Sequence, residues 1–492
     1  MKAIKYIILV MAAAVGSACS DFLNVNPSTS VADSEVFQTV SGAQAALNGC
    51  YRQMVAYGAG GADRQDDYGI PSIMHISDMC GEDIIGWGGW YTYVYNYWGE
   101  TRADIFRSSQ LWTYHYRLIN NVNGILANIE GADGDSVEKQ YISGQALAMR
   151  GWAYFSLARL FQQTYSIASG LPGVPIYLEP TNDKTEGRPR GTLADTYKQA
   201  LSDLGEAELL LEGFNRGPSS NINRIDRFVV EGILAQAYQA MRNWPKAEEY
   251  AMRLVDKYPL TTNEQYLAGF NDENTPSWIW GMRQTEDQNM GDYSQFAMWG
   301  NEGRKCFSFY GWFLSDDFVA LFEEDDIRYQ FEWWWDQIHA SNKFRDNADC
   351  RGSYCFMRAE EMLLNAAEAK ARQGKDAEAR DLLNKLQAMR NAKPSESSGN
   401  DLIEDILLER RKELYGEGYA LFDMLRNQKP LLRTGNHANY NGSFQLPARS
   451  WRFIFQLPRS EMLNNKALVD GIWPNGDQNP YSGVFETDAS YH

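Results

Sequence analysis

The residues that most often carry out catalysis or bind metals are few and scattered in this sequence. No two of the five histidines have the spacing of a metal-binding pair, and no nucleophile, zinc-protease, phosphate-loop or dinucleotide motif is present. Acidic runs at residues 66–67 and 323–326 offer the paired carboxylates that a glycosidase needs. In a chain with 64 Asp and Glu, such runs are more typical of a solvated face. The sequence therefore predicts a protein that is not an enzyme and that needs no metal or cofactor.

A dense aromatic segment at residues 87–98, WGGWYTYVYNYW, points to binding instead. Its tyrosines alternate, so an extended chain would place them all on one face. Flat aromatic faces suit sugars, because the apolar side of a sugar ring stacks on Trp or Tyr while its hydroxyls need donors and acceptors nearby. The same groups can hold peptides, and the alternative is that these rings pack the core. The ligand contacts expected here are Asp78, Trp87, Trp90, Tyr91, Asn96 and Trp98.

A second aromatic set lies later in the chain and could face the first across a cleft. The ligand contacts expected from it are Trp299, Asn301, Arg304 and Trp312, with Phe307 and Tyr310 beside them. A third set, at residues 333–335, lies in FEWWWDQIH, which is predicted to be a strand. At least one of those three tryptophans must face inward there, so core packing is the stronger interpretation for them.

The elements that must position these residues are mainly helices. Apolar periodicity predicts helices at residues 43–55, 111–129, 137–161 and 193–211. Residues 228–259 fit the tetratricopeptide pattern, in which small alanines let two antiparallel helices approach closely. Residues 360–391 form a weaker copy, with Lys370 where tyrosine is expected. Stacked helix pairs of this kind usually contact another protein.

Two long stretches between the helices have another character. Residues 57–101 and 263–356 are rich in Gly, Asp, Asn and aromatic residues and show little helical period. Irregular segments of this length are usually functional or disordered, and their aromatic content argues against disorder. We therefore predict a mostly α fold, in which tetratricopeptide-like repeats pack against a loop-rich, aromatic-rich half with minor β structure.

The N-terminus is typical of an exported protein. Lys2 and Lys5 precede a short apolar run at residues 6–15, and the small residues 16–18 precede Cys19. We expect residues 1–18 to be a signal peptide, Cys19 to carry a lipid anchor, and residues 19–32 to form a polar tether. The imperfect site at Gly16 also fits an ordinary signal peptidase, which would release a soluble protein.

The remaining chain, residues 33–492, is expected to form one domain. Its strongly acidic character, with a net charge of −18 for the full sequence, excludes nucleic acid as a natural partner. With Cys19 lipidated, five cysteines remain, so at least one is unpaired within the chain. Cys350 and Cys355 are close enough in sequence to pair, although two reduced, buried thiols are an equal alternative.

Several segments together resemble the SusD/RagB family of outer-membrane nutrient-binding lipoproteins of Bacteroidetes. The start CSDFLNVNPSTS, the helix GQALAMRGWAYFSLARLF with the following GVPIYLEPT, and the later helix FMRAEEMLLNAAEAKAR are similar to family signatures. So are LLERRKELYGEGYALFDMLR and FQLPRSEMLNNKAL near the C-terminus. The five segments occur in the family's order and span nearly the whole mature chain.

This resemblance implies a mostly helical, tetratricopeptide-containing fold and a place on the outer membrane at the cell surface. It also implies a SusC-like TonB-dependent transporter as partner and an oligosaccharide or polysaccharide as ligand, or a peptide in RagB-like relatives. Ligand residues vary within the family, so the site residues above rest on the local sequence. The alternatives are a helical-repeat scaffold that binds no small ligand and a glycan-cleaving enzyme.

Overall fold

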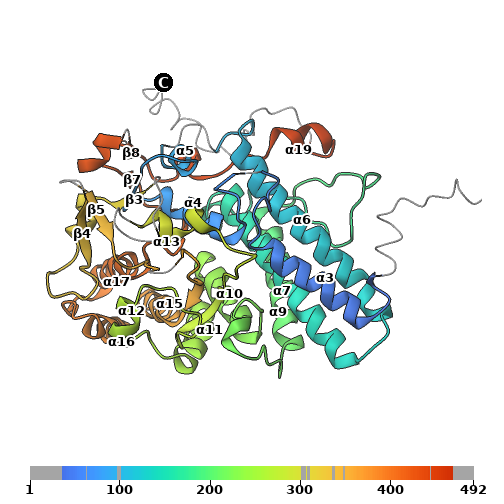
Figure 1. The fold of residues 1–492 in the computed structure, drawn as a ribbon, viewed down its shortest axis with the longest axis horizontal. Helices are drawn as coiled ribbons and strands as arrows, with labels where there is room; N and C mark the ends of the chain where they lie inside the picture. Colours follow the sequence, from blue (N-terminus) through green and yellow to red (C-terminus); the bar gives the residue numbers. More distant parts are fainter. Residues whose placement is uncertain are drawn as a thin grey trace, which may run out of the picture.

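The computed structural model describes residues 36–62, 64–96, 101–300, 306, 311–334, 338–346, 349–440, 442–443 and 445–468, with only the backbone described at 332–334 and 338. Helices dominate, which confirms the predicted mostly α class. The long N-terminal helices lie to the right in Figure 1 and β3, β4 and β5 to the left. These long helices are α3 (Val40–Gln53), α6 (Phe106–Asn128), α7 (Ser136–Phe161) and α9 (Leu193–Leu210), within a few residues of their predicted bounds.

The tightest helix pair in this half is α7 with α9. Asp135 caps α7 by accepting the N–H groups of Val137 and Glu138 at 2.9 Å. Gly151 on α7 allows the close approach, since a Cβ there would lie 2.8 Å from Leu204 Cγ and 2.9 Å from the Ala200 carbonyl oxygen of α9. The close packing of α9 against α7 covers one side of the core.

The two predicted helical repeats are present as antiparallel helix pairs. Their interfaces are built on fully buried alanines, among them Ala235, Ala247, Ala367 and Ala379. Lys370, which stands in place of the expected tyrosine, pairs with Glu248 of the preceding repeat at 2.9 Å, so its charge links the two pairs. The pairs are α10 (Arg227–Ala240) with α11 (Trp244–Lys257), and α15 (Ala359–Ala371) with α16 (Asp376–Met389).

The two stretches predicted to be irregular contain short elements, so that prediction is only partly right. A four-stranded antiparallel sheet has the order β1-β3-β5-β4, and β2 pairs with β6. The segment FEWWWDQIH forms two strands rather than one. The strands are β1 (Ile84–Gly86), β2 (Trp278–Met282), β3 (Trp312–Leu314), β4 (Phe331–Trp334), β5 (Ile338–Ser341), β6 (Tyr354–Arg358), β7 (Leu431–Leu432) and β8 (Gln445–Leu446).

One helix in the first of these stretches, α4 (Ile70–Met79), shows no amphipathic period because all ten of its residues are buried. A helix that is covered on every side needs no polar face, so periodicity could not reveal it. The remaining helices are α5 (Tyr91–Tyr95), α8 (Tyr165–Ala168), α12 (Asn263–Leu267), α13 (Gln295–Met298), α14 (Asp316–Val319), α17 (Gly399–Leu414), α18 (Ala420–Asn427) and α19 (Arg459–Asn464).

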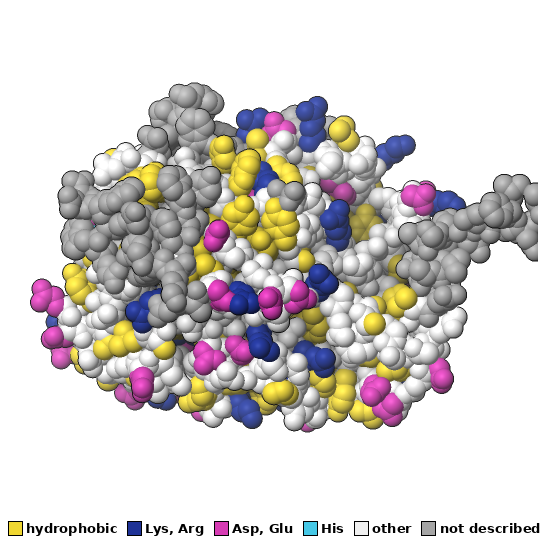
Figure 2. Space-filling model, in the orientation of Figure 1, with side chains coloured by type: hydrophobic (Ala, Val, Ile, Leu, Met, Phe, Trp, Pro, Cys, Tyr) yellow, Lys and Arg dark blue, Asp and Glu magenta, His cyan; other side chains and the backbone are white. Residues whose placement is uncertain are grey.

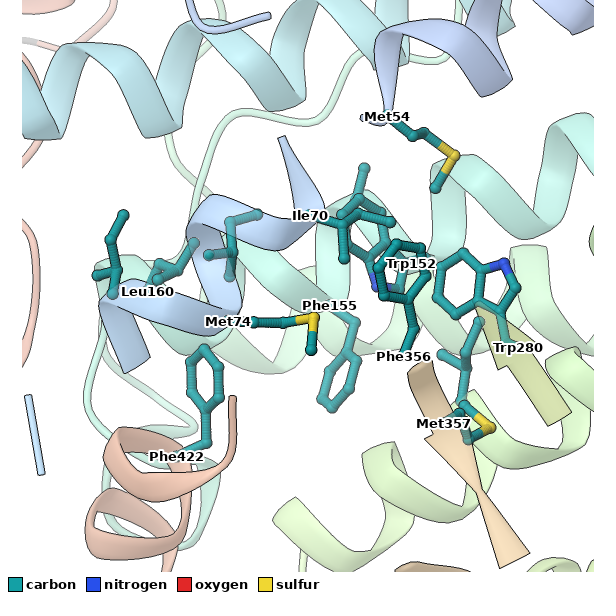
Figure 3. Packing of buried hydrophobic residues seen from close by; sticks show 14 of the residues in the cluster. Met54, Ile70, Met74, Trp152, Phe155, Leu160, Trp280, Phe356, Met357 and Phe422 are labelled. Carbon is teal, nitrogen blue, oxygen red and sulfur yellow. The ribbon is translucent and has the colours of Figure 1, made fainter. Parts of the chain in front are cut away.

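The core joins the two halves where α4, α7, β2, β6 and α18 meet (Figure 3). Trp152 of α7 meets Trp280 of β2 edge-on, with ring centroids 6.2 Å apart, and Trp280 meets Phe356 of β6 at 5.3 Å. Met74 of α4 lies near Phe422 of α18 in the same view. Large rings packed across element boundaries join the N-terminal helices to strands β2 and β6 in one large cluster. A second, smaller cluster fills the space between α15, α16 and α17 (Gly399–Leu414).

A buried ionic cluster lies on the C-terminal side of this core. Glu413 of α17 pairs with Arg328, Arg358 and Arg390 at 2.8–3.0 Å. Burial disfavours the Glu413 carboxylate, but the charges of the three guanidinium groups outweigh it and hold its pKa well below the usual value. The cluster contains equal numbers of cations and anions, all buried: Arg328, Lys343, Arg358, Arg390 and Lys412 with Asp326, Glu360, Glu409, Glu413 and Glu417.

A disulfide joins Cys306 to Cys350, so a Cys350–Cys355 pair is not formed, and the alternative of two reduced thiols holds for Cys355 but not for Cys350. Cys355 is a buried free thiol on β6, as is Cys50 on α3. Within the described ranges, no helix combines the length and the apolarity needed to cross a membrane.

Candidate functional site

The aromatic segment at residues 87–96 follows strand β1 and turns sharply into a short helix. β1 pairs with β3, and the Trp87 N–H donates to the Gly311 carbonyl at 3.0 Å. Gly88 and Gly89 then take left-handed backbone angles, with φ of +74° and +70°, which side chains with a Cβ rarely adopt. This turn starts α5 at Tyr91.

The helix overturns the expected one-sided row of tyrosines. In α5, Tyr91 and Tyr95 lie one turn apart and point into the core, whereas Tyr93 points out and is 50% exposed. Tyr95 donates to or accepts from His437 Nδ1 at 2.7 Å. The helical period therefore divides the tyrosines between packing and surface.

Three of the predicted ligand-contacting aromatics belong to the core. Tyr91, Trp299 and Trp312 are 2%, 0% and 4% exposed. Two of them pack against His75: the Tyr91 hydroxyl lies 3.1 Å from His75 Nδ1, and the Trp312 ring lies 4.7 Å from the imidazole. Trp299 meets Trp312 edge-on at 5.7 Å. Because these rings are covered by one another, they offer no stacking face to a ligand, and the prediction is corrected for them.

Asp78 is also structural. Its carboxylate accepts the N–H groups of Gly418 at 2.8 Å and Ala420 at 3.3 Å, so it fixes the start of α18 to the end of α4. Burial raises the pKa of Asp78 to about 7, against the lowering effect of these hydrogen bonds. The side chain is 4% exposed, and the prediction that it orients a ligand is therefore corrected as well.

The exposed aromatic rings form a small surface, which we call the Trp90 surface: Trp87, Trp90, Tyr93 and Arg64. Trp90 is 41% exposed, Trp87 is half-buried, and the rings of Trp90 and Tyr93 lie 5.9 Å apart at 33°. Figure 2 shows hydrophobic side chains gathered on this face between α5 and the start of α6. Among the predicted site residues with described side chains, Trp87 and Trp90 are the two aromatics that keep an exposed ring.

Trp90 is held rigidly from behind. The Arg64 guanidinium lies 3.9 Å from the Trp90 ring centre and 4.6 Å from that of Phe106. Arg64 donates two hydrogen bonds to Asp66, at 2.8 and 3.0 Å, and Asp66 is paired in turn with the buried Arg107. The Trp90 N–H also donates to Gln65 Oε1 at 3.4 Å. A ring fixed in this way loses little side-chain freedom when a ligand stacks on it.

Sequence reasoning missed Arg64 as part of this surface and Phe106 as the ring that packs against Arg64. Arg64 lies in the run RQDD, where the acidic pair 66–67 drew attention only as possible catalytic carboxylates. Both carboxylates are instead structural, since Asp67 accepts the N–H groups of Gly60 and Ala62 at 2.8 Å. The closeness of Arg64 to Asp66 in the sequence was the one signal that could have indicated an ion pair at this place.

Asn96 ends α5, and its Oδ1 is buried with no hydrogen-bond partner among the described residues. Trp98, Asn301, Arg304 and Cys19 lie outside the described residues, as do Phe307 and Tyr310.

Comparisons with known proteins agree with this architecture. A family model described as "Starch-binding associating with outer membrane" matches residues 25–216, and a model described as "SusD family" matches residues 329–480. A SusD-like protein of Formosa agariphila is 25% identical over 284 residues, which cover 55% of this chain and 50% of that protein. The aligned region thus spans about half the length of that relative.

Solved structures match over most of the chain. A SusD-like carbohydrate binding protein from Bacteroides vulgatus is 29% identical, with a TM-score of 0.79 over 89% of this chain and 100% of that one. A SusD superfamily protein from Bacteroides thetaiotaomicron is 25% identical, with a TM-score of 0.75 over 87% and 98%. The helical repeats, the strands packed against them and these matches lead to one conclusion: the chain belongs to the SusD/RagB family.

Proposed function

We propose that this protein is a lipid-anchored outer-membrane protein that binds oligosaccharides at the cell surface through the Trp90 surface. It would deliver them to a SusC-like TonB-dependent transporter. The observation that carries the proposal is Trp90 itself, an exposed tryptophan clamped by Arg64. Arg64 and its ion pair with Asp66 hold the exposed ring in one orientation, which reduces the entropy that a stacking ligand would lose on binding.

The chemistry of the surface favours a sugar. Trp90 and Tyr93 offer flat faces for the apolar side of sugar rings, and Arg64 lies beside them as a donor for hydroxyls. We propose that the amide of Asn96, which ends α5 beside this surface, also takes part, although its Oδ1 is buried in the structure and must turn outward to accept from a ligand. We propose that Trp98, Asn301 and Arg304 complete the contact.

Binding by single variants tests the site. Isothermal titration calorimetry with a panel of neutral oligosaccharides should identify a ligand for the purified protein. For that ligand, Trp90→Ala should weaken binding at least about tenfold, the effect of a central aromatic contact. Trp87→Ala should weaken it less, because its ring is already half-buried.

Trp244→Ala is the matched control. Trp244 starts α11, far along the chain, and also has an arginine over its ring, Arg372 at 5.5 Å. Its loss should leave affinity unchanged. Equal affinity in wild type, Trp90→Ala and Trp87→Ala would remove the Trp90 surface from the proposal.

Two further assays separate the alternatives. Binding of peptides but of no oligosaccharide would indicate a RagB-like role, and copurification with a transporter without ligand binding would indicate a scaffold. Release of new reducing ends from a bound oligosaccharide would reveal an enzyme.

A further inference from the structure

A long groove runs between α3, α6, residues 177–187 and α19, and it contains none of the residues of the Trp90 surface. Its volume is about 1460 Å³, above the roughly 300–1,000 Å³ of sites for single small molecules. Helix α6 lines it from Trp112 to Asn128, which is about 24 Å at 1.5 Å per residue. A groove of this volume and length can hold a ligand made of several sugar or amino-acid units.

The charge of this groove differs from that of the protein as a whole. Its lining includes two cations, Arg52 and Arg117, and one carboxylate, Glu461. The whole chain has 64 acidic and 46 basic residues. Figure 2 shows that the face over α3 and α6 carries few charged side chains. An anion would therefore meet less repulsion in this groove than elsewhere on the surface.

Arg117 carries a positive charge that no carboxylate neutralises among the residues that the structure describes. It is exposed, and its side chain forms neither an ion pair nor a hydrogen bond there. Its guanidinium lies beside Gly61, where an added Cβ would be in ordinary van der Waals contact with Nη1 at 3.5 Å. Arg52 is also exposed. The hydrogen bond from the Thr285 hydroxyl is the main cause that lowers the pKa of Asp287, and the charge of Arg52 adds a smaller effect. A planar guanidinium with free donors matches a carboxylate with two parallel hydrogen bonds.

Amide side chains along the groove keep unused hydrogen-bonding atoms. Asn120 uses its Oδ1 for Thr181, and Asn121 uses its Nδ2 for Gln53. Asn182 uses its Oδ1 for the Lys184 N–H. The other amide atom of each has no partner among the described residues, so the groove offers both donors and acceptors to hydroxyl groups.

Aromatic rings lie at both sides of these amides. Tyr116 packs on Trp112 at 4.6 Å and meets Tyr177 edge-on at 6.0 Å, and its hydroxyl donates to the Pro175 carbonyl at 2.7 Å. Tyr57 is 45% exposed and packs on Tyr68. The groove thus combines fixed rings, free amides and an arginine whose charge the described residues leave unpaired.

We propose that this groove is a second saccharide site, which takes an acidic oligosaccharide and pairs a sugar carboxylate with Arg117. The amides would bind hydroxyls, and the rings would stack on the apolar faces of the sugars. An acidic peptide would share the carboxylate, but a peptide anchor needs a well-defined apolar pocket, and the centre of this groove is lined by amides. The site is independent of the Trp90 surface, so either could exist without the other.

Three oligouronates of equal length serve as probes: an oligogalacturonate, an oligoguluronate and an oligomannuronate, each beside its neutral methyl ester. Calorimetry should find at least one acid that binds about tenfold more tightly than its ester. Arg117→Gln should weaken that acid about tenfold and the ester little, because only the charged ligand loses an ionic hydrogen bond. Trp90→Ala should leave the acid's affinity unchanged.

Lys385→Gln is the charge-matched control, since it removes one exposed cation from α16. It should leave binding of the acid as in wild type. The proposal is overturned if none of the three acids binds, if acid and ester bind equally, or if Arg117→Gln binds like wild type. It is also overturned if hexaglutamate displaces the bound acid with equal or higher affinity, since the groove would then be a peptide site.

Discussion

His75 is a buried imidazole that its surroundings keep neutral. The rings of Tyr91, Trp312 and Tyr354 lie within 6.0 Å of it, and its Nε2 has no hydrogen-bond partner among the described residues. Burial lowers the pKa of His75 to about 3, from a usual value near 6.5. The unfolded chain therefore gains a proton below pH 6.5 that the folded protein does not accept until about pH 3.

This difference makes stability fall as the pH falls from about 6.5 towards about 4. His75 alone contributes a decrease in the free energy of unfolding of about 1.4 kcal/mol per pH unit. Urea denaturation between about pH 4.5 and about pH 6 should show a slope that is shallower by about that amount in His75→Phe, and above about pH 7 the two slopes should be equal. Tyr91→Phe removes the same hydrogen bond without a group that titrates in this range, so it should lower stability by a constant offset. Equal slopes in His75→Phe and wild type in the lower of these pH ranges would refute the assignment.

Residue types alone could not separate packing from surface. Trp90 and Trp299 are the same residue in similar aromatic surroundings, yet one is 41% exposed and the other is fully buried. The difference arises from β1 pairing with β3, a contact between residues more than two hundred positions apart. The aromatic segment at residues 87–98 was predictable as a candidate binding region, but which of its rings are exposed depends on that long-range contact.

Helix α17 shows how one element can carry charges with opposite roles. Glu413, on its buried side, is held by three arginines, whereas Glu404, on its outer side, pairs with Lys429 and has a side chain that is 58% exposed. A buried carboxylate that neutralises several cations cannot be removed without leaving them uncompensated. An exposed pair loses little when broken, because water solvates both groups.

Glu413→Gln should therefore lower the free energy of unfolding by about 3–5 kcal/mol, measured by urea denaturation at neutral pH. Glu404→Gln, on the same helix, should change it by less than about 1 kcal/mol. A loss of similar size in both variants would mean that the helix, rather than the buried cluster, is what responds.

At the scale of elements, the long helices were predictable and the short ones were not. The sequence located α7 and α9 within one residue at each end. Helix α9 buries one stripe, whereas α7 is buried on nearly every side after Ile142 and its start is marked by the capping residue Asp135. In α4 all residues are buried, so its sequence has no helical periodicity of apolar and polar residues. In α5 the five residues are too few to show such a periodicity. The alternating tyrosines of α5 therefore led to the wrong prediction of an extended chain.

At the scale of the whole molecule, the proposed lipid anchor would set where the proposed binding surface operates. Lipid on Cys19 would keep the protein at the outer membrane, and its removal should release a folded protein. In Cys19→Ala, cell fractionation should move the protein from the membrane to the soluble fraction, with an unchanged circular dichroism spectrum and melting temperature. A folded variant that stays in the membrane fraction would show that another contact holds it there.

The buried ionic cluster has a consequence for how the chain reaches its folded state. Four of its five cations, from Arg328 to Arg390, precede Glu409, Glu413 and Glu417 in the sequence. During synthesis the N-terminal residues emerge first, so these four cations are made while Asp326 and Glu360 are the only acids of the cluster present. The repeats at residues 228–259 and 360–391 can pair early, but their shared core cannot close until α17 arrives. We therefore expect the ionic cluster to pack only after the ribosome has synthesised α17, which lies in the last quarter of the chain.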